Sequence, residues 1–275
     1  MLALAGVLSL LLIAVVVNFL LHDGEATIDP FNPIAAAASQ TEASSGYSGR
    51  TAVVYTVEGV DAPVDGNGTF SYNAGTGRTE AELSVPTPAG TVDVETVGDP
   101  GHIYLRSAMF AGQLPDGAEW IGVEPLIGQT SPGFAGSEGA ESQLQMLRAV
   151  ADVERVGSEA VDGVTTSRYH GTIYLDRVAD YFEGQGETGL ATEFRNLDEL
   201  APDPMQVEVW IAPGGILRQL RMISTIPADS GPKVTMDMVM TIDKLGVSPS
   251  IDLPDPNSVY DATPLLRRQL DSLSG

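Results

Sequence analysis

The chain has 275 residues, of which 14 are Lys or Arg and 37 are Asp or Glu, so its formal net charge is −23. Binding of nucleic acid, or of an anionic membrane surface by charge, needs clustered basic side chains, and this balance argues against both. The absence of cysteine excludes disulfide bonds, thiol catalysis, cysteine-based metal sites and a lipid attached to an N-terminal cysteine.

The first predicted element is an apolar segment at the N-terminus, residues 1–21, which is followed by a polar stalk at residues 22–33. A helix of about 20 residues spans about 30 Å, the thickness of the hydrocarbon core of a bilayer. The segment is therefore predicted to be a transmembrane anchor or an uncleaved signal. A cleaved signal is the alternative, with cleavage sites at Gly24-Glu25-Ala26 or at residues 36–38. These readings predict a single-pass protein of the cell membrane with an extracytoplasmic domain, or a secreted protein.

Residues 34–45 are rich in alanine and predict a helix that stops at Gly46. The apolar period then changes to two, which is typical of half-buried antiparallel strands separated by turns. Asp65-Gly66-Asn67-Gly68 predicts a hairpin turn leading into the next strand. The strands predicted in this part of the chain are residues 51–57, 69–72, 80–85, 92–96, 103–105 and 120–123.

The middle of the chain predicts strands interrupted by a helical insert. A loose stretch at 124–139 is followed by helical spacing at 144–150 and by strands at 153–156 and 165–174. An amphipathic helix begins at Leu175 and contains Val178, Tyr181 and Phe182. Glycines at 184–189 are predicted to break it before a second helix at 190–200, and Pro202 and Pro204 end the insert.

The last third predicts three consecutive strands, at residues 206–211, 216–226 and 233–244, with a tight turn at Pro213-Gly214-Gly215. In the third strand Val234, Met236, Met238 and Met240 are predicted to face one side, because alternate side chains point to the same face. Residues 263–275 form a C-terminal tail, which contains a short predicted surface helix at 265–273.

No catalytic or metal-binding constellation is evident. The histidines are His22, His102 and His170, no Gly-x-Ser-x-Gly motif occurs, and no histidine pair has the spacing of a zinc site. His170 is read as a solvent-facing or packed strand residue. The sequence therefore predicts a protein that is not an enzyme and that needs no cofactor.

The one suggestive constellation is a methionine stripe formed by Met236, Met238 and Met240 with Met222 of the preceding strand. Methionine is flexible and polarizable, and it suits surfaces that accept varied ligands. Two readings remain open, an ordinary core and the deformable wall of an apolar cavity. The residues predicted to line such a cavity are Met222, Val234, Met236, Met238, Met240, Val178, Tyr181 and Phe182.

Three segments carry a resemblance to a known family. They are VDGVTTSRYHGTI at residues 161–173, VEVWI at 207–211 and GGILR at 214–218. In their order and texture they resemble actinobacterial lipoproteins of the LppX/LprG type, which belong to the wider LolA-like group. The alanine-rich segment at 35–46 fits the N-terminal helix of that family, and the similarity extends over residues 34–262.

The resemblance implies an α+β fold at residues 34–262, with a strongly curved antiparallel sheet (half-barrel) and helices packed on its concave face. It also implies an apolar cavity that binds acylated lipids or lipoproteins and serves their presentation or transport in the cell envelope. The alternative within the wider fold is an RseB-like regulator that binds a membrane-protein partner. The missing lipid-bearing cysteine is a departure, for which the apolar N-terminus would substitute as the anchor.

Overall fold

A computed structural model describes residues 32–59, 63–87, 90–110, 112–124, 146–147, 149–186, 188–200, 203–226 and 232–264. The predicted N-terminal helix, nearly all of the stalk, the predicted C-terminal helix and part of the predicted helix at 144–150 lie outside these ranges. Within them, no helix combines the length and the apolar character needed to cross a membrane.

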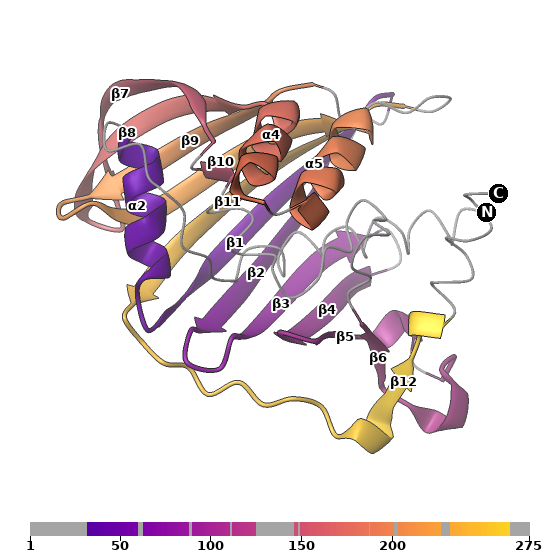
Figure 1. The fold of residues 1–275 in the computed structure, drawn as a ribbon. Coiled ribbons are helices and arrows are strands. Elements are labelled where there is room, and N and C mark those ends of the chain that lie inside the picture. The colour runs from indigo at the N-terminus through magenta and orange to yellow at the C-terminus, as the bar shows by residue number, and fades with distance from the viewer. Residues whose placement is uncertain are drawn as a thin grey trace.

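The described strands form one 12-stranded sheet in the order β12-β6-β5-β4-β3-β2-β1-β11-β10-β9-β8-β7. Each pair of neighbours is antiparallel except β12 and β6, which are parallel. The sheet is not closed and curves around its helices (Figure 1), in agreement with the predicted half-barrel. The strands are β1 (Gly46–Val57), β2 (Val64–Asn73), β3 (Arg78–Thr87), β4 (Gly90–Asp99), β5 (His102–Ser107), β6 (Trp120–Val123), β7 (Ala151–Val161), β8 (Val164–Ile173), β9 (Met205–Ala212), β10 (Ile216–Ile226), β11 (Val234–Leu245) and β12 (Val259–Asp261).

Three α-helices lie on the concave side of the sheet (Figure 1): α2 (Pro33–Glu42), α4 (Leu175–Gln185) and α5 (Thr188–Leu200). Helix α2 begins at an Asn32 cap, whose side chain accepts hydrogen bonds from the backbone N–H groups of Ile34 and Ala35 at 3.0 and 3.1 Å. Its buried alanines are small, and α2 therefore packs closely on β10 and β9. Three short 3₁₀ helices complete the described elements: η1 (Ala108–Phe110), η2 (Pro115–Gly117) and η3 (Pro256–Ser258).

Helices α4 and α5 form a hairpin. The rings of Phe182 and Phe194 stack with centroids 5.3 Å apart and an interplanar angle of 5°. The predicted break at residues 184–189 is confirmed, because α4 ends at Gln185 and α5 begins at Thr188. The helix is capped by Gly186, whose φ of 84° is the left-handed conformation that glycine adopts without steric cost.

The predicted turn at residues 65–68 is wrong, because the whole segment lies inside β2. Its glycines allow neighbouring strands to approach closely, and they do not reverse the chain. A Cβ atom on Gly66 would lie 2.9 Å from Cγ1 of Val53, and a Cβ atom on Gly68 would lie 2.1 Å from the backbone oxygen of Glu82. Glycine in a strand interior can mark such an approach, so an Asp-Gly-Asn-Gly run is not always a turn.

The segment at residues 246–258, the strap, carries the chain from β11 in the middle of the sheet to β12 at its edge (Figure 1). The Asn73 side chain donates to the Pro249 carbonyl at 2.7 Å, and Arg78 donates to the Ile251 carbonyl at 3.0 Å. Ile251 packs with Trp120 in a small apolar cluster at this edge. The strap thereby fastens the β6 edge to the body of the sheet, and the sequence patterns did not predict it or β12.

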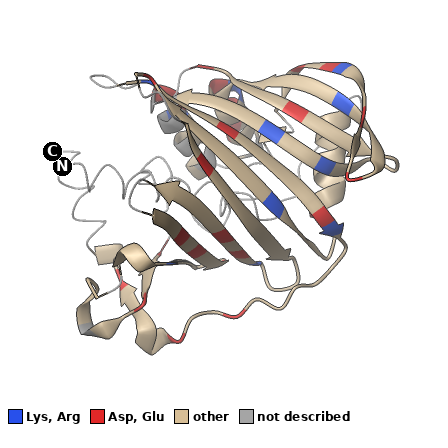
Figure 2. Cartoon of the chain, turned by 180° about the vertical axis from the view of Figure 1, so that it is seen from behind, with Lys and Arg blue, Asp and Glu red and all other residues tan. Residues whose placement is uncertain are grey.

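The convex face of the sheet is charged (Figure 2). Arg221 is paired with Asp237 of β11 at 2.6 Å and with Glu208 of β9 at 3.4 Å, and Arg168 of β8 contacts the same Glu208. Hydrogen bonding to Asp237 raises the pKa of Arg221. Cross-strand pairs of this kind fix which face of the strands meets water, and so the apolar face is turned toward the helices.

Candidate functional site

The candidate site is the apolar inner face of the sheet together with the helices that cover it. Strand register places Val53 opposite Met238, Met238 opposite Met222, and Met222 opposite Val207. These four side chains form a row across β1, β11, β10 and β9, and none is more than 4% exposed. Directly opposed residues share a face, so the row is a continuous apolar surface.

A second row of inward side chains lies next to the first. Thr51 of β1 stands opposite Met240, Met240 stands opposite Leu220, and Leu220 stands opposite Val209. All four are buried. The predicted methionine stripe therefore lies on the inner face, and Met222 joins it from β10.

Helices α4 and α5 cover this floor with apolar side chains. Val178 is fully buried and Phe182 is 2% exposed, and both belong to the same core cluster as the two rows. From α5, Phe194 joins the cluster, while Arg195 pairs with Asp180 at 3.4 Å on the neighbouring helix. Among the described side chains, the ion pairs of Arg195 stay within the hairpin, and apolar side chains of both helices share a core cluster with the floor.

Burial decreases along the stripe toward the end of the sheet where β1 leads to β2 and β10 leads to β11. Met238 and Met240 are buried, whereas Met236 and Val234 are half-buried. Tyr55, which stands opposite Met236, is half-buried too, and burial raises the pKa of its hydroxyl. The apolar floor therefore extends from beneath the helices to a partly exposed end.

The structure brings most of the predicted site residues together. Five belong to one core cluster, and Met236 and Tyr181 pack against it. Val234 is half-buried at the start of β11. Their role as the wall of a ligand cavity stays a prediction. The five clustered residues are Met222, Met238, Met240, Val178 and Phe182.

Three residues of the candidate site were missed by the sequence reasoning: Thr51 and Tyr55 on the inner face and Phe194 on α5. The alternation of β1 puts Thr51 and Tyr55 on one face, but it does not show that β1 pairs with β11 at the far end of the chain. Phe194 was expected in a helix, and its place in the core cluster of the floor is seen only in the folded chain.

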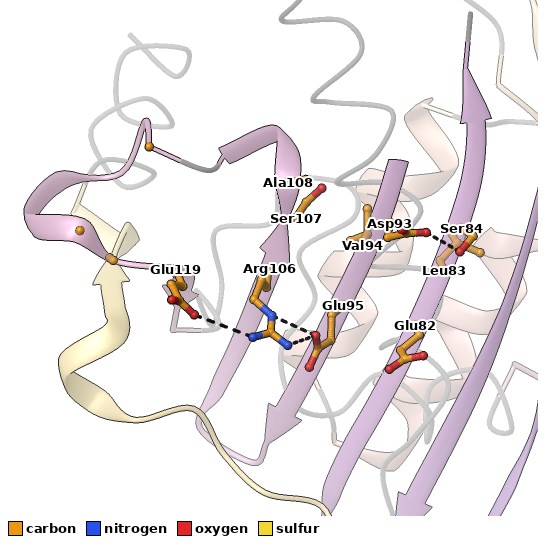
Figure 3. A pocket seen from close by; sticks show the side chains of 13 residues that line it. Glu82, Leu83, Ser84, Asp93, Val94, Glu95, Arg106, Ser107, Ala108 and Glu119 are labelled. Carbon is orange, nitrogen blue, oxygen red and sulfur yellow. Dashed lines mark hydrogen bonds and ion pairs between the residues drawn. The ribbon is translucent and has the colours of Figure 1, made fainter. Parts of the chain in front are cut away.

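An open pocket of about 710 Å³ lies elsewhere, where the outward side chains of β3, β4 and β5 meet the η1–η2 segment (Figure 3). Arg106 contacts Glu95, lies 3.9 Å from Glu119, and stacks 4.6 Å above the Trp120 ring. Arg106 is therefore paired with carboxylates of the pocket itself, and the pocket is built around this internal ion pair.

The carboxylates around this pocket repel one another. The pKa of Glu80, on the same face of β3, is raised mainly by burial and further by the negative charges of Glu82 and Glu95. An anionic ligand would meet the same repulsion here. The inner face is the better candidate for an apolar guest.

The described histidines do not form a catalytic arrangement. His102 stacks on Tyr104 with ring centroids 5.9 Å apart, and Nε2 of His170 lies 3.0 Å from the side-chain oxygen of Gln206. Within the described ranges, no serine hydroxyl contacts either ring. No group of three or more acidic or histidine side chains there could hold a metal ion.

Neither a protein-family model nor a curated protein matches the chain. Among solved structures, it is similar to LprF from Mycobacterium bovis, at 18% identity over 83% of this chain and 99% of LprF, with a TM-score of 0.39. It is similar to the Mycobacterium tuberculosis lipoprotein LppX, at 17% identity over 82% of this chain and 100% of LppX, with a TM-score of 0.41. A DUF1329 family protein from Desulfovibrio piger matches at 11% identity over 76% of this chain and 90% of that protein, with a TM-score of 0.32. LppX is itself a lipoprotein of the type that the sequence resembles.

Proposed function

We propose that this protein binds an acylated lipid, or the acyl chains of a lipoprotein, between the inner face of its sheet and the α4–α5 hairpin. The observation that carries this proposal is the apolar floor, which runs from the buried Met240 and Met238 to the half-buried Met236 and Val234. Acyl chains need a large apolar surface and few directional contacts. Methionine side chains adjust to guests of different shape.

The way in which the hairpin is held supports entry of a guest. Among the described residues, apolar side chains of α4 and α5, Phe182 and Phe194 among them, share a core cluster with the floor. Apolar contacts are not directional, so they tolerate a shift of the hairpin better than hydrogen bonds would. A lipid chain would replace the protein contacts that are lost, and this makes a binding function easier to realise than a catalytic one.

We further propose that the domain acts on the outer side of the cytoplasmic membrane. The apolar segment at residues 1–21 would keep it there, and the net charge of −23 suits an exposed protein that does not adhere to anionic surfaces. A tethered domain would receive or present lipid at one membrane and would not shuttle between two.

The experiment compares two aspartate substitutions on one strand. The full chain, purified in a fluorinated surfactant that does not dissolve acyl chains, is titrated with a pyrene-labelled diacylglycerol. Met236→Asp places a charge on the inner face, and Val239→Asp places one on the opposite face, next to Arg221. We expect saturable binding by the wild-type chain, a loss of about tenfold or more for Met236→Asp, and little change for Val239→Asp.

Extraction of the purified chain provides a second readout. Mass spectrometry of the organic extract is expected to show a diacyl or triacyl lipid in stoichiometric amount. A wild-type chain that binds no probe and yields no lipid would refute the proposal. Equal losses in the two aspartate variants would place the lipid elsewhere on the molecule.

A further inference from the structure

Two hydroxyl groups in the apolar core have no hydrogen-bond partner in the part of the chain that the structure describes. They are Oγ1 of Thr51 on the floor and the phenolic oxygen of Tyr181 on α4, and both atoms are buried. Other buried hydroxyls are paired: Thr41 donates to the Ala37 carbonyl at 2.8 Å, and Thr166 donates to the Glu159 carbonyl at 2.7 Å. The hydroxyl of Ser39 on α2 is a further buried group without a partner among the described residues. An unpaired buried hydroxyl is costly, so the two on the floor and on α4 need an explanation.

Both hydroxyls belong to the candidate lipid site. Thr51 is 4% exposed and lies in the second row of the floor, between Met240 of β11 and Gly68 of β2. Tyr181 packs against the same core cluster, and its ring meets that of Phe182 edge-on with centroids 5.5 Å apart. Each hydroxyl is therefore held on the core side of its element, one from the sheet and one from the helices.

The side chains around the Thr51 hydroxyl determine which kind of ligand atom these two hydroxyl donors can bind. The inward positions of β1 and β11 around Thr51 hold apolar side chains and Tyr55, with no charged residue. A carboxylate or phosphate there would be a buried charge without a counter-ion, which is strongly unfavourable. An ester carbonyl is neutral and accepts hydrogen bonds, so it can satisfy a hydroxyl donor in an apolar site.

We infer that Thr51 and Tyr181 donate hydrogen bonds to the ester carbonyls of a neutral acyl ester bound between the sheet and the α4–α5 hairpin. This inference rests on the proposed function, and it adds that the site selects esters over ethers and free fatty acids. The two hydroxyls are specificity-determining groups, because hydrocarbon contacts alone would bind all three classes.

The test pairs two probes with three variants of the full chain. The probes are a pyrene-labelled diacylglycerol and its dialkyl ether analogue, which lacks the carbonyl oxygens. Thr51→Val and Tyr181→Phe remove one hydroxyl each with little change in shape, and Thr56→Val is the control on the exposed side of β1. We expect each of the first two variants to weaken diester binding about fivefold or more, with ether binding unchanged and with no effect of Thr56→Val.

Infrared spectroscopy tests the same contact in the unaltered protein, so the inference does not depend on the folding of a variant. A ¹³C-labelled ester carbonyl is expected to absorb at lower wavenumber when bound than in alkane, because hydrogen bonding weakens the C=O bond. Equal loss of diester and ether binding, or no loss of either, would overturn the inference and leave the proposed function standing. A wild-type chain that binds neither probe would overturn both.

Discussion

Substitution of Phe194 by alanine is expected to destabilise the whole domain, because the α4–α5 hairpin completes a core that the sheet cannot bury alone. The ring is 2% exposed and stacks on Phe182. Truncation of a buried phenylalanine costs about 3–5 kcal/mol. With a urea m-value of roughly 3 kcal/mol/M for a domain of this size, the unfolding midpoint should fall by about 1–1.7 M. Urea unfolding followed by circular dichroism measures this shift.

The double-mutant cycle with Phe182→Ala isolates the stacked pair. We expect the two losses to be non-additive by about 0.5–1.5 kcal/mol, the range measured for aromatic pairs beyond their burial. A loss below about 1 kcal/mol for Phe194→Ala, with the m-value unchanged, would refute the reasoning. The hairpin would then not be part of the core that holds the sheet in shape.

Two glycine substitutions should change the free energy of unfolding in opposite directions, as measured by urea denaturation. Gly49→Ala places a Cβ atom 2.0 Å from the Thr241 carbonyl oxygen and should lower the free energy of unfolding by about 1–3 kcal/mol. Gly184→Ala in α4 meets no atom within 4 Å and should raise the free energy of unfolding by about 0.5–1 kcal/mol. Equal signs would contradict this. Burial and neighbouring carboxylates raise the pKa of Glu80, so the folded chain holds its proton to higher pH than the unfolded chain does, and stability falls as the pH rises through that raised pKa. Glu80→Gln should flatten this part of the pH profile, and a profile that Glu80→Gln leaves unchanged would show that the pKa shift is absent.

Local patterns predicted the part of the site that one strand carries. The alternation of Met236, Met238 and Met240 identified an inner face because the period of two belongs to the strand itself. The Pro213-Gly214-Gly215 turn was found for a similar reason, since Gly214 and Gly215 adopt positive φ angles of 92° and 80°. Features that depend on a few consecutive residues can be read from the sequence.

Features that depend on distant pairing could not be read in this way. Thr51 lies beside Met240 only because β1 pairs with β11, and no local pattern specifies that pairing. The glycines of β2 matched a turn motif, whereas the close approach of Val53 and of the β3 backbone explains them. The strap has no helical or strand-like periodicity of apolar residues. Its position follows from hydrogen bonds such as that from the Asn73 side chain to the Pro249 carbonyl.

Photolabelling tests the central claim most directly, namely that acyl chains occupy the space between the inner face and the α4–α5 hairpin. A diacylglycerol with a diazirine in its acyl chain is bound to the full chain, illuminated and mapped after trypsin digestion. Cleavage after Lys233 and Lys244 releases residues 234–244, which contain the stripe of β11, and cleavage after Arg177 and Arg195 releases residues 178–195 of the hairpin. Label on these two peptides, competed by unlabelled lipid, is the predicted result. Label confined to peptides that lack inner-face residues, or label that unlabelled lipid does not displace, would contradict the claim.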